Sequence, residues 1–249
     1  MQKIRILTYH RVGLPRQGRY EKFTVLPNRF ALQMRTLARL GFGFVSMDYA
    51  LECLQGAGDS AGSANAALLK KRSPVVVTFD DGYGDLMEHA LPLLKALKIP
   101  AMIYIVAAQA SDQWVDWGER GPLQLLSWPD LKAMVAEGMT PGSHTLTHPH
   151  LMQISRNQLR AEVIDSKKII EDRLGVQVRH FCYPFGEFDE RVEETVREAG
   201  YLTACTTQRG VAQKGVHPLR LPRLSVGKRM GWFRFMVRIL IRNKSRAAR

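Results

Sequence analysis

The chain has 249 residues, of which 45% are hydrophobic and 24% charged, and its formal net charge is +13. This length and composition are those of an ordinary globular protein that can bury a sizeable core. Three cysteines exclude a disulfide framework, and no apolar run approaches the length of a membrane span.

The positive charge is concentrated at the C-terminal end of the chain. Residues 209–249 contain 12 of the 36 Lys and Arg residues and no Asp or Glu, so the rest of the chain is nearly neutral. At the other end, Met1 leads directly into a strand pattern without the apolar region of a signal peptide. We therefore expect a cytoplasmic protein, although an exported protein that has lost its leader would look the same.

Strand patterns alternate with helix patterns along the chain. The predicted strands cover residues 4–9, 44–46, 74–79, 101–106, 178–183, 201–206 and 219–226, with a further short strand before Gly142. The predicted helices begin at Asn28, Asp48, Leu86, Ser127, Ser155 and Asp189, with a kink expected at Pro92. About seven strand and helix alternations with short connections predict a parallel α/β fold, and the count favours a closed or nearly closed barrel. Residues 55–67 are expected to form a surface loop.

The segment 73–85 contains the most informative motif of the chain. Its β-branched run ends in Asp80 and Asp81, which Gly82 follows directly. Neighbouring side chains within a strand point to opposite faces, so two adjacent aspartates can share one site only where the strand gives way to a loop. The carboxyl end of a parallel strand is such a place, although Asp-Asp-Gly is also a common composition for a solvated turn.

His144 and His148 are spaced to reach one ion, either on a helix or across a tight turn. The flanking residues Pro141 and Pro149 favour the turn. Paired histidines are common on protein surfaces, but together with one carboxylate they make a three-ligand site of the zinc type. The second aspartate would then be available as a base.

Three motifs in this order resemble those of the polysaccharide deacetylases, the NodB-homology or carbohydrate esterase family 4. The motifs are Thr78-Phe79-Asp80-Asp81-Gly82, Ser143-His144-Thr145-Leu146-Thr147-His148 and Tyr183-Pro184-Phe185-Gly186. The likeness runs from Tyr9-His10 to Leu221-Pro222-Arg223. It implies a distorted (β/α) barrel as a single domain, which we place at residues 1–230, with residues 231–249 as a basic amphipathic tail.

The resemblance also implies roles for individual residues. Asp81, His144 and His148 would bind a divalent metal, zinc in the first instance, and Asp80 would be the general base that activates a metal-held water. The oxyanion donor would be the backbone amide of Tyr183 or of a neighbouring residue.

The sequence departs from the family pattern at two places. The late histidine that many members use as general acid is absent from residues 219–226, and we predict that His10 replaces it, with His217 as the less favoured alternative. Many members also carry an arginine that orients the base at the position of Cys182. Arg220 or Arg223 could take over its role.

Residues 231–242 form a basic amphipathic pattern, with Trp232, Phe235 and Ile239 on one side and Arg234 on the other. Such a helix suits either peripheral contact with an anionic membrane or packing as the last helix of the barrel. Because no recognition fold accompanies the charge, we do not expect nucleic acid as a partner.

The expected activity is that of a hydrolase acting on carbon-nitrogen bonds other than peptide bonds, in linear amides. It would remove N-acetyl groups from an amino-sugar polysaccharide, oligosaccharide or lipid-linked glycan precursor, at the cytoplasmic face of the membrane if the tail binds there. The alternatives are a deformylase-type amidohydrolase and a catalytically degenerate glycan-binding protein. The exact substrate and the oligomeric state are not encoded in any pattern that we find.

Overall fold

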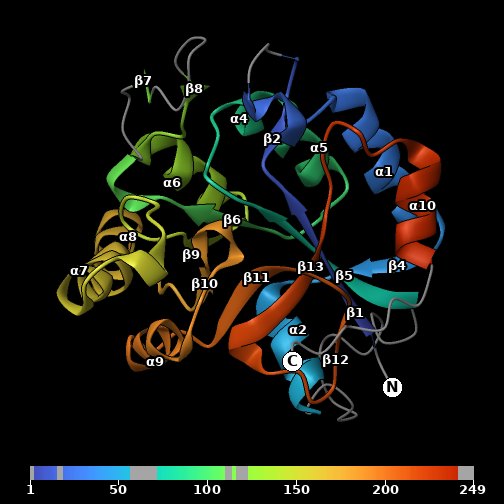
Figure 1. Ribbon diagram of the computed structural model, residues 1–249. Coiled ribbons are helices and arrows are strands. Elements are labelled where there is room, and N and C mark those ends of the chain that lie inside the picture. The colour runs from blue at the N-terminus through green and yellow to red at the C-terminus, as the bar shows by residue number, and fades with distance from the viewer. Residues whose placement is uncertain (1–2, 16–18, 57–71, 110–113, 116–122, 241–249) are drawn as a thin grey trace.

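Seven parallel strands close into a barrel in the computed structural model, which describes residues 3–15, 19–56, 72–109, 114–115 and 123–240 (Figure 1). Around the barrel, the strands are β1 (Lys3–Tyr9), β13 (Leu221–Ser225), β11 (Thr203–Arg209), β10 (His180–Cys182), β9 (Thr140–Ser143), β6 (Ala101–Ile105) and β5 (Arg72–Phe79). The pairing of β5 with β1 closes the ring. The predicted distorted barrel of about seven strands is therefore confirmed.

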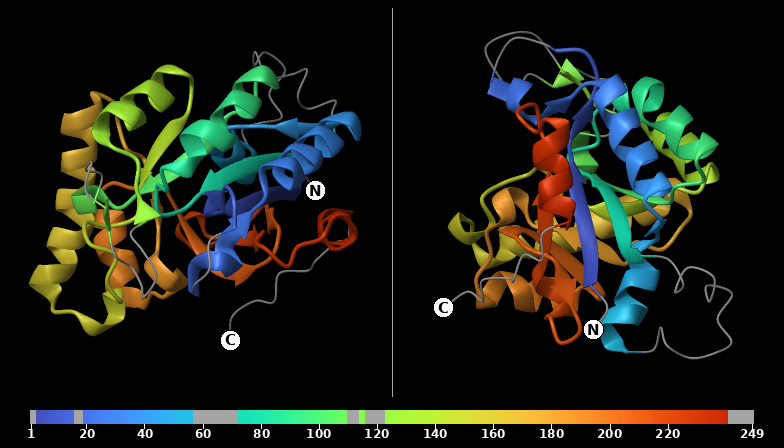
Figure 2. Two further views of the ribbon diagram at one scale, coloured as in Figure 1. Left: turned by 90° about the horizontal axis from the view of Figure 1, so that it is seen from above. Right: turned by 90° about the vertical axis from the view of Figure 1, so that its right-hand side faces the viewer.

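Helices surround the barrel (Figure 2). They are α1 (Pro27–Arg39), α2 (Met47–Gln55), α4 (Asp85–His89), α5 (Leu91–Ala96), α6 (Trp128–Ala136), α7 (Arg156–Arg160), α8 (Ser166–Leu174), α9 (Glu190–Glu198) and α10 (Trp232–Leu240). Short strands lie outside the ring: β2 (Arg11–Val12), β3 (Thr24–Val25), β4 (Phe42–Phe44), β7 (Trp114–Val115), β8 (Leu123–Gln124) and β12 (Ala212–Gln213). Among the described residues, no helix reaches the length and apolarity that crossing a bilayer requires.

Helix α2 closes the N-terminal end of the barrel. Buried side chains from six of the seven barrel strands form one cluster with the apolar face of α2. Asp48 in the first turn of α2 accepts hydrogen bonds from Arg179 (2.9 Å) and His180 (3.1 Å) at the start of β10. Among the described residues, the cleft that a ligand can enter lies at the opposite end, where the strands finish.

Three of the six predicted helix starts are confirmed by side-chain caps. Capping boxes form at Ser127 and Ser155, and the Asp189 side chain accepts a hydrogen bond from the Val192 amide. The expected kink at Pro92 separates α4 from α5. The predicted start of α1 at Asn28 was wrong: the N-cap is Leu26, no side chain caps the helix, and Pro27 occupies its first position.

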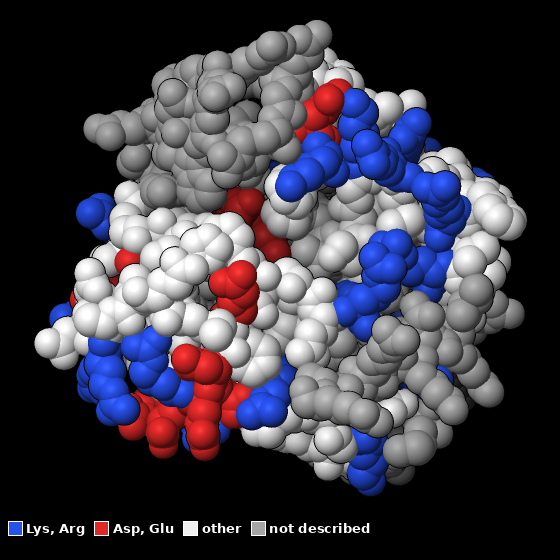
Figure 3. Space-filling view, viewed as in Figure 1, with Lys and Arg blue, Asp and Glu red and all other residues white. Residues whose placement is uncertain are grey.

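The predicted helix at the C-terminal end packs on the barrel. Phe235, Met236 and Ile239 of α10 are buried, and Arg5 of β1 donates to the carbonyl oxygen of Ile239 (2.6 Å). Helix α10 lies beside α1, and Lys and Arg side chains gather on the same side of the molecule (Figures 1 and 3). The helix thus contributes to the core, although residues 241–249 of the predicted tail and most of the predicted loop at 55–67 lie outside the described residues.

We predict that Phe235→Ala lowers the free energy of unfolding by about 3–5 kcal/mol, because it removes a buried ring that joins α10 to the core. The matched control is Phe233→Ala on the same helix, where the ring is 73% exposed and the change should stay within about 0.5 kcal/mol. Chemical denaturation measures both. Equal stability of the two variants would show that α10 is a separate tail.

Candidate metal centre and catalytic cleft

The Asp-Asp-Gly motif directs two carboxylates into one cleft at the end of β5. The Asp80 amide still donates to the Tyr9 carbonyl oxygen (2.9 Å), as in the preceding strand. Asp81 and Gly82 then both adopt left-handed backbone conformations, with φ values of 72° and 77°. Aspartate tolerates this region better than most residues and glycine does so freely. The reversal brings both carboxylates to the wall of a cleft of about 760 Å³.

The segment after β9 holds both histidines in a tight turn, as the flanking prolines predicted. Thr145 and His148 have positive φ angles (71° and 62°), and the Thr145 hydroxyl oxygen accepts a hydrogen bond from the His148 amide (2.9 Å). The buried Glu162 carboxylate accepts hydrogen bonds from the amides of Leu146 (2.9 Å) and Thr147 (2.8 Å). These bonds fix the backbone between the two imidazoles.

Asp81, His144 and His148 bring three potential ligand atoms together. Asp81 Oδ1 lies 3.4 Å from His144 Nε2 and 3.6 Å from His148 Nε2. A tetrahedral zinc ion with bonds of about 2.0–2.1 Å separates its ligand atoms by about 3.3–3.4 Å. The three side chains therefore fit a divalent cation with little movement.

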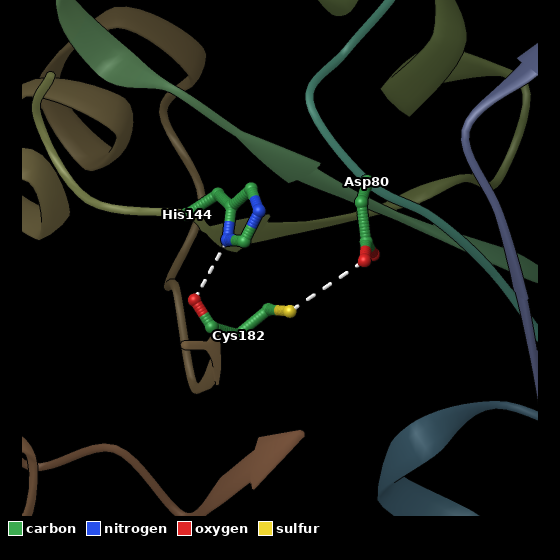
Figure 4. Close-up of side chains that lie close together, drawn as sticks. All are labelled: Asp80, His144 and Cys182. Atoms are coloured by element: carbon green, nitrogen blue, oxygen red, sulfur yellow. Dashed lines mark hydrogen bonds between the residues drawn. The ribbon is translucent and has the colours of Figure 1, made fainter. Parts of the chain in front are cut away.

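A hydrogen bond from the opposite ring nitrogen sets the orientation of His144. His144 Nδ1 lies 2.7 Å from the carbonyl oxygen of Cys182, which can only accept (Figure 4). Nδ1 therefore carries a proton, and Nε2 faces Asp81. This second contact is the kind that holds a metal-binding imidazole in place.

The ionisation of the cluster also suits a cation. Burial raises the pKa of Asp81, but the hydrogen bond from His144 and the charge of nearby imidazoles outweigh it and lower the pKa well below its ordinary value. Burial and then the charge of His144 lower the pKa of His148 to about 4, which keeps that ring neutral at pH 7. Burial lowers the pKa of His144, but Cys182 and Asp81 raise it by more. A cation bound there would take the place of the His144 proton.

Asp80, His144 and Cys182 form a second group with ligand-type atoms close together. The Cys182 sulfur lies 3.7 Å from Asp80 Oδ2 (Figure 4). The guanidinium of Arg223, however, donates to both Asp80 oxygens at 2.7 Å and lies 3.1 Å from the Cys182 sulfur. Because a fixed positive charge occupies this position, the group does not fit a metal ion.

Arg223 contacts Asp80 and can replace the arginine that many family members carry at the position of Cys182. It is 2% exposed and binds Asp80 bidentately from β13, a different strand from the one that carries Cys182. Burial raises the pKa of Asp80, but the charge and hydrogen bonds of Arg223 lower it by more, so the carboxylate is ionised at neutral pH. The other predicted replacement, Arg220, pairs instead with Glu193.

His10 lines the same cleft as the two aspartates. It follows the end of β1, is half-buried, and stacks on Phe23 with ring centroids 4.5 Å apart. The alternative acid, His217, is exposed and its ring accepts a hydrogen bond from the Leu219 amide (3.3 Å), outside the cleft. The structure therefore brings His10 to the site and leaves His217 away from it.

The amide of Tyr183 has a partner in the substrate-free chain. It donates to the Cys205 carbonyl oxygen (3.1 Å) and so extends the pairing of β10 with β11. Pro184 has no amide hydrogen, and Phe185 follows with a left-handed backbone (φ 60°) at the wall of the cleft. The Phe185 amide, unlike that of Tyr183, therefore belongs to the turn that follows β10 and not to the sheet.

One residue of the site, Glu162, and the ring contacts of a second, Phe185, were not predicted from the sequence. Glu162 occupies the core-facing side of the predicted long helix, between Leu159 and Val163, and a carboxylate within an apolar stripe was a usable signal. Phe185 stacks on His150 (4.0 Å between centroids) and contacts His148 edge-on (4.7 Å), which no sequence pattern indicated.

The closed parallel barrel and the cluster of ionisable groups at its carboxyl end define the class of (β/α)-barrel proteins, whose active sites lie at this end. Residues 69–204 match the family model described as polysaccharide deacetylase. The chain belongs to the polysaccharide deacetylase family.

Three similar proteins illustrate the relationship. The Bacillus subtilis protein YxkH is 30% identical over 155 residues, which cover 61% of this chain and 52% of YxkH. The chitooligosaccharide deacetylase of Sinorhizobium fredii is 29% identical over 129 residues, 51% of this chain and 53% of the relative. The chain thus spans about half the length of these curated relatives. The solved structure of IcaB from Ammonifex degensii superposes with a TM-score of 0.78 at 27% identity and covers 94% of this chain and 95% of IcaB.

We predict that His148→Ala loses bound zinc, because it removes one of three ligand atoms around the proposed position. His150→Ala is the matched control: His150 lies two residues away, pairs with Glu187 (2.9 Å) and is 44% exposed. Elemental analysis after zinc loading and dialysis measures both. Retention of zinc by His148→Ala and its loss from His150→Ala would move the ligand role to His150.

Proposed function

We propose that this protein is a metal-dependent hydrolase of linear amides that removes N-acetyl groups from an amino-sugar glycan. The proposal rests on one observation: two carboxylates with different partners line the same cleft. Asp81 lies with His144 and His148 in a cation-sized cluster, while Asp80 is bound by Arg223 and remains ionised. One carboxylate is thus arranged as a ligand and the other as a base.

A divalent cation bound by Asp81, His144 and His148 would lower the pKa of water and polarise the substrate carbonyl. The contribution of the chain is to hold a base beside it. Arg223 fixes both oxygens of Asp80, which limits the rotation of the carboxylate and keeps it charged. Asp80 can then accept the proton of the attacking water.

The departing amine needs a proton, and we assign this step to His10. Its position on the wall of the cleft that Asp80 and Asp81 also line supports the assignment. For the oxyanion, we propose a backbone amide of the segment that begins at Tyr183. The Phe185 amide suits the role because the Tyr183 amide is bonded to Cys205.

The substrate class follows from the family. The named activities of the relatives include deacetylation of chitooligosaccharides and of peptidoglycan N-acetylglucosamine. We propose an N-acetylated polysaccharide, oligosaccharide or lipid-linked precursor for this chain, with zinc as the metal. Acetate or formate release from matched amino sugars distinguishes a deacetylase from a deformylase.

Peripheral membrane contact at the cytoplasmic face is a proposal that rests on α10. Trp232 and Phe233 are 50% and 73% exposed at its start, and Arg234 is exposed beside them. Exposed aromatic rings next to arginine suit the interface of an anionic bilayer. The helix would bind through these residues while Phe235 stays in the core.

We predict that Asp80→Asn lowers turnover by about 10²–10⁴-fold while zinc remains bound, because it removes the base and leaves the three ligands in place. Asp172→Asn, the same change at an exposed position of α8, should act like the wild type. Acetate release and zinc content are measured together. Equal turnover by Asp80→Asn and the wild type would favour the degenerate glycan-binding protein.

His10→Ala should reduce turnover by about 10²-fold or more without loss of zinc, because the leaving amine would depart without a positioned acid. His217→Ala is the control and should keep the wild-type rate. The comparison uses the rate at saturating substrate, since the defect is expected in the chemical step. A wild-type rate for His10→Ala would exclude it as the acid.

A further inference from the structure

A basic groove of about 600 Å³ adjoins the catalytic cleft and shares Lys22, Ser225 and Gly227 with it. Five basic side chains line the groove: Lys22, Lys228, Arg229, Arg234 and Arg238. Lys and Arg side chains surround a hollow on the side of the molecule where α10 lies (Figures 1 and 3). Four basic side chains of the C-terminal region, Lys228, Arg229, Arg234 and Arg238, therefore lie at the edge of the catalytic cleft.

The walls of this groove are built by close contacts between two segments. The Lys228 amide donates to the Lys22 carbonyl oxygen (3.0 Å). A Cβ atom at Gly227 would lie 2.5 Å from the same oxygen, so only glycine permits the approach. Arg238 reaches back from α10 and donates to the Ser225 carbonyl oxygen (2.6 Å).

Most of the positive charge in the groove is not neutralised. Glu21, the one acidic side chain among the described lining residues, pairs with Lys228. Within the described part of the chain, Arg229, Arg234 and Arg238 form no ion pair with a carboxylate. Burial, and then the charge of Arg209, lower the pKa of Arg238. An anion bound in the groove would interact favourably with these unpaired cationic side chains.

The groove begins close to the catalytic base. Arg223, which holds Asp80, and Ser225, which accepts from Arg238, are two residues apart on β13. Such residues lie about 6.6 Å apart along a strand. One sugar unit can bridge this separation, so a substituent on the sugar whose N-acetyl group reaches Asp80 can enter the groove.

We propose that the groove of Lys22, Arg229, Arg234 and Arg238 binds a phosphate or pyrophosphate group attached to the amino sugar. The location of the sugar rests on the proposed deacetylase function, whereas the anion site rests on the groove itself. Guanidinium groups bind phosphate oxygens through paired, charge-assisted hydrogen bonds. Several arginines around one space suit a phosphate better than a carboxylate, because a phosphate offers more oxygens and more charge.

The first test measures binding without turnover. Calorimetry with the full, metal-free chain compares N-acetylglucosamine 1-phosphate with N-acetylglucosamine. We expect the phosphate to tighten binding about tenfold or more, and the Arg229→Ala/Arg234→Ala variant to abolish this gain. Both side chains are exposed, so the variant should fold.

The matched control removes two exposed charges from α7 and α8 as Arg156→Ala/Lys168→Ala, and it should keep the gain. Equal binding of the phosphorylated and free sugars would overturn the proposal. Equal weakening by the groove variant and the control would also overturn it, since it would reveal only a general effect of charge.

The second test follows acetate release by the zinc-loaded chain. The groove variant should lower kcat/KM for the sugar phosphate and leave that for the methyl glycoside unchanged. Faster release from a polyprenyl diphosphate sugar in vesicles than from the soluble phosphate would support a lipid-linked source, and equal rates would support a soluble one. No release from any substrate, with phosphate-dependent binding intact, would refute the deacetylase function and leave the anion site standing.

Discussion

Two adjacent carboxylates are buried at the end of β5, and the structure tolerates this density of negative charge because each has its own positive or ligand-type partners. Arg223 binds both oxygens of Asp80. Asp81 faces two imidazoles on the other side of the cleft. A buried carboxylate without such a partner would be protonated or would destabilise the fold. Because the two carboxylates have separate partners, Asp81 could act as a metal ligand while Asp80 acts as the base, as we propose.

The arrangement depends on segments that are far apart in the sequence. Strand β13 delivers Arg223, β9 leads into the turn with both histidines, and the carbonyl oxygen of Cys182 in β10 orients His144. Parallel strands that close into a barrel bring all these ends to one rim. At the same rim, β13 continues through Gly227 into α10, which places the basic groove beside the base. Neighbouring parts of one strand would thus hold the catalytic base and contact the charged group of the substrate.

Much of this was predictable from the sequence. Apolar β-branched runs predicted the strands and helical periodicity predicted the helices, and the Asp-Asp-Gly and H-x-x-x-H spacings identified residues that the fold brings together. Other features depend on tertiary contacts that no local pattern contains. The choice between Arg220 and Arg223 required knowing which face of the last strand meets Asp80, and the Tyr183 amide proved to be bonded across to β11. Whether Phe235 is buried against the barrel also depends on tertiary contacts that the sequence pattern does not contain.

X-ray absorption at the zinc edge of the loaded chain tests the central claim most directly. The structure offers two ligand-type groups that share His144, one with Asp81 and His148 and one with Asp80 and Cys182. Our account predicts nitrogen and oxygen neighbours at about 2.0–2.2 Å and no sulfur. A zinc–sulfur distance of about 2.3 Å would place the ion against Cys182, displace Arg223 from Asp80 and contradict the assignment of ligand and base.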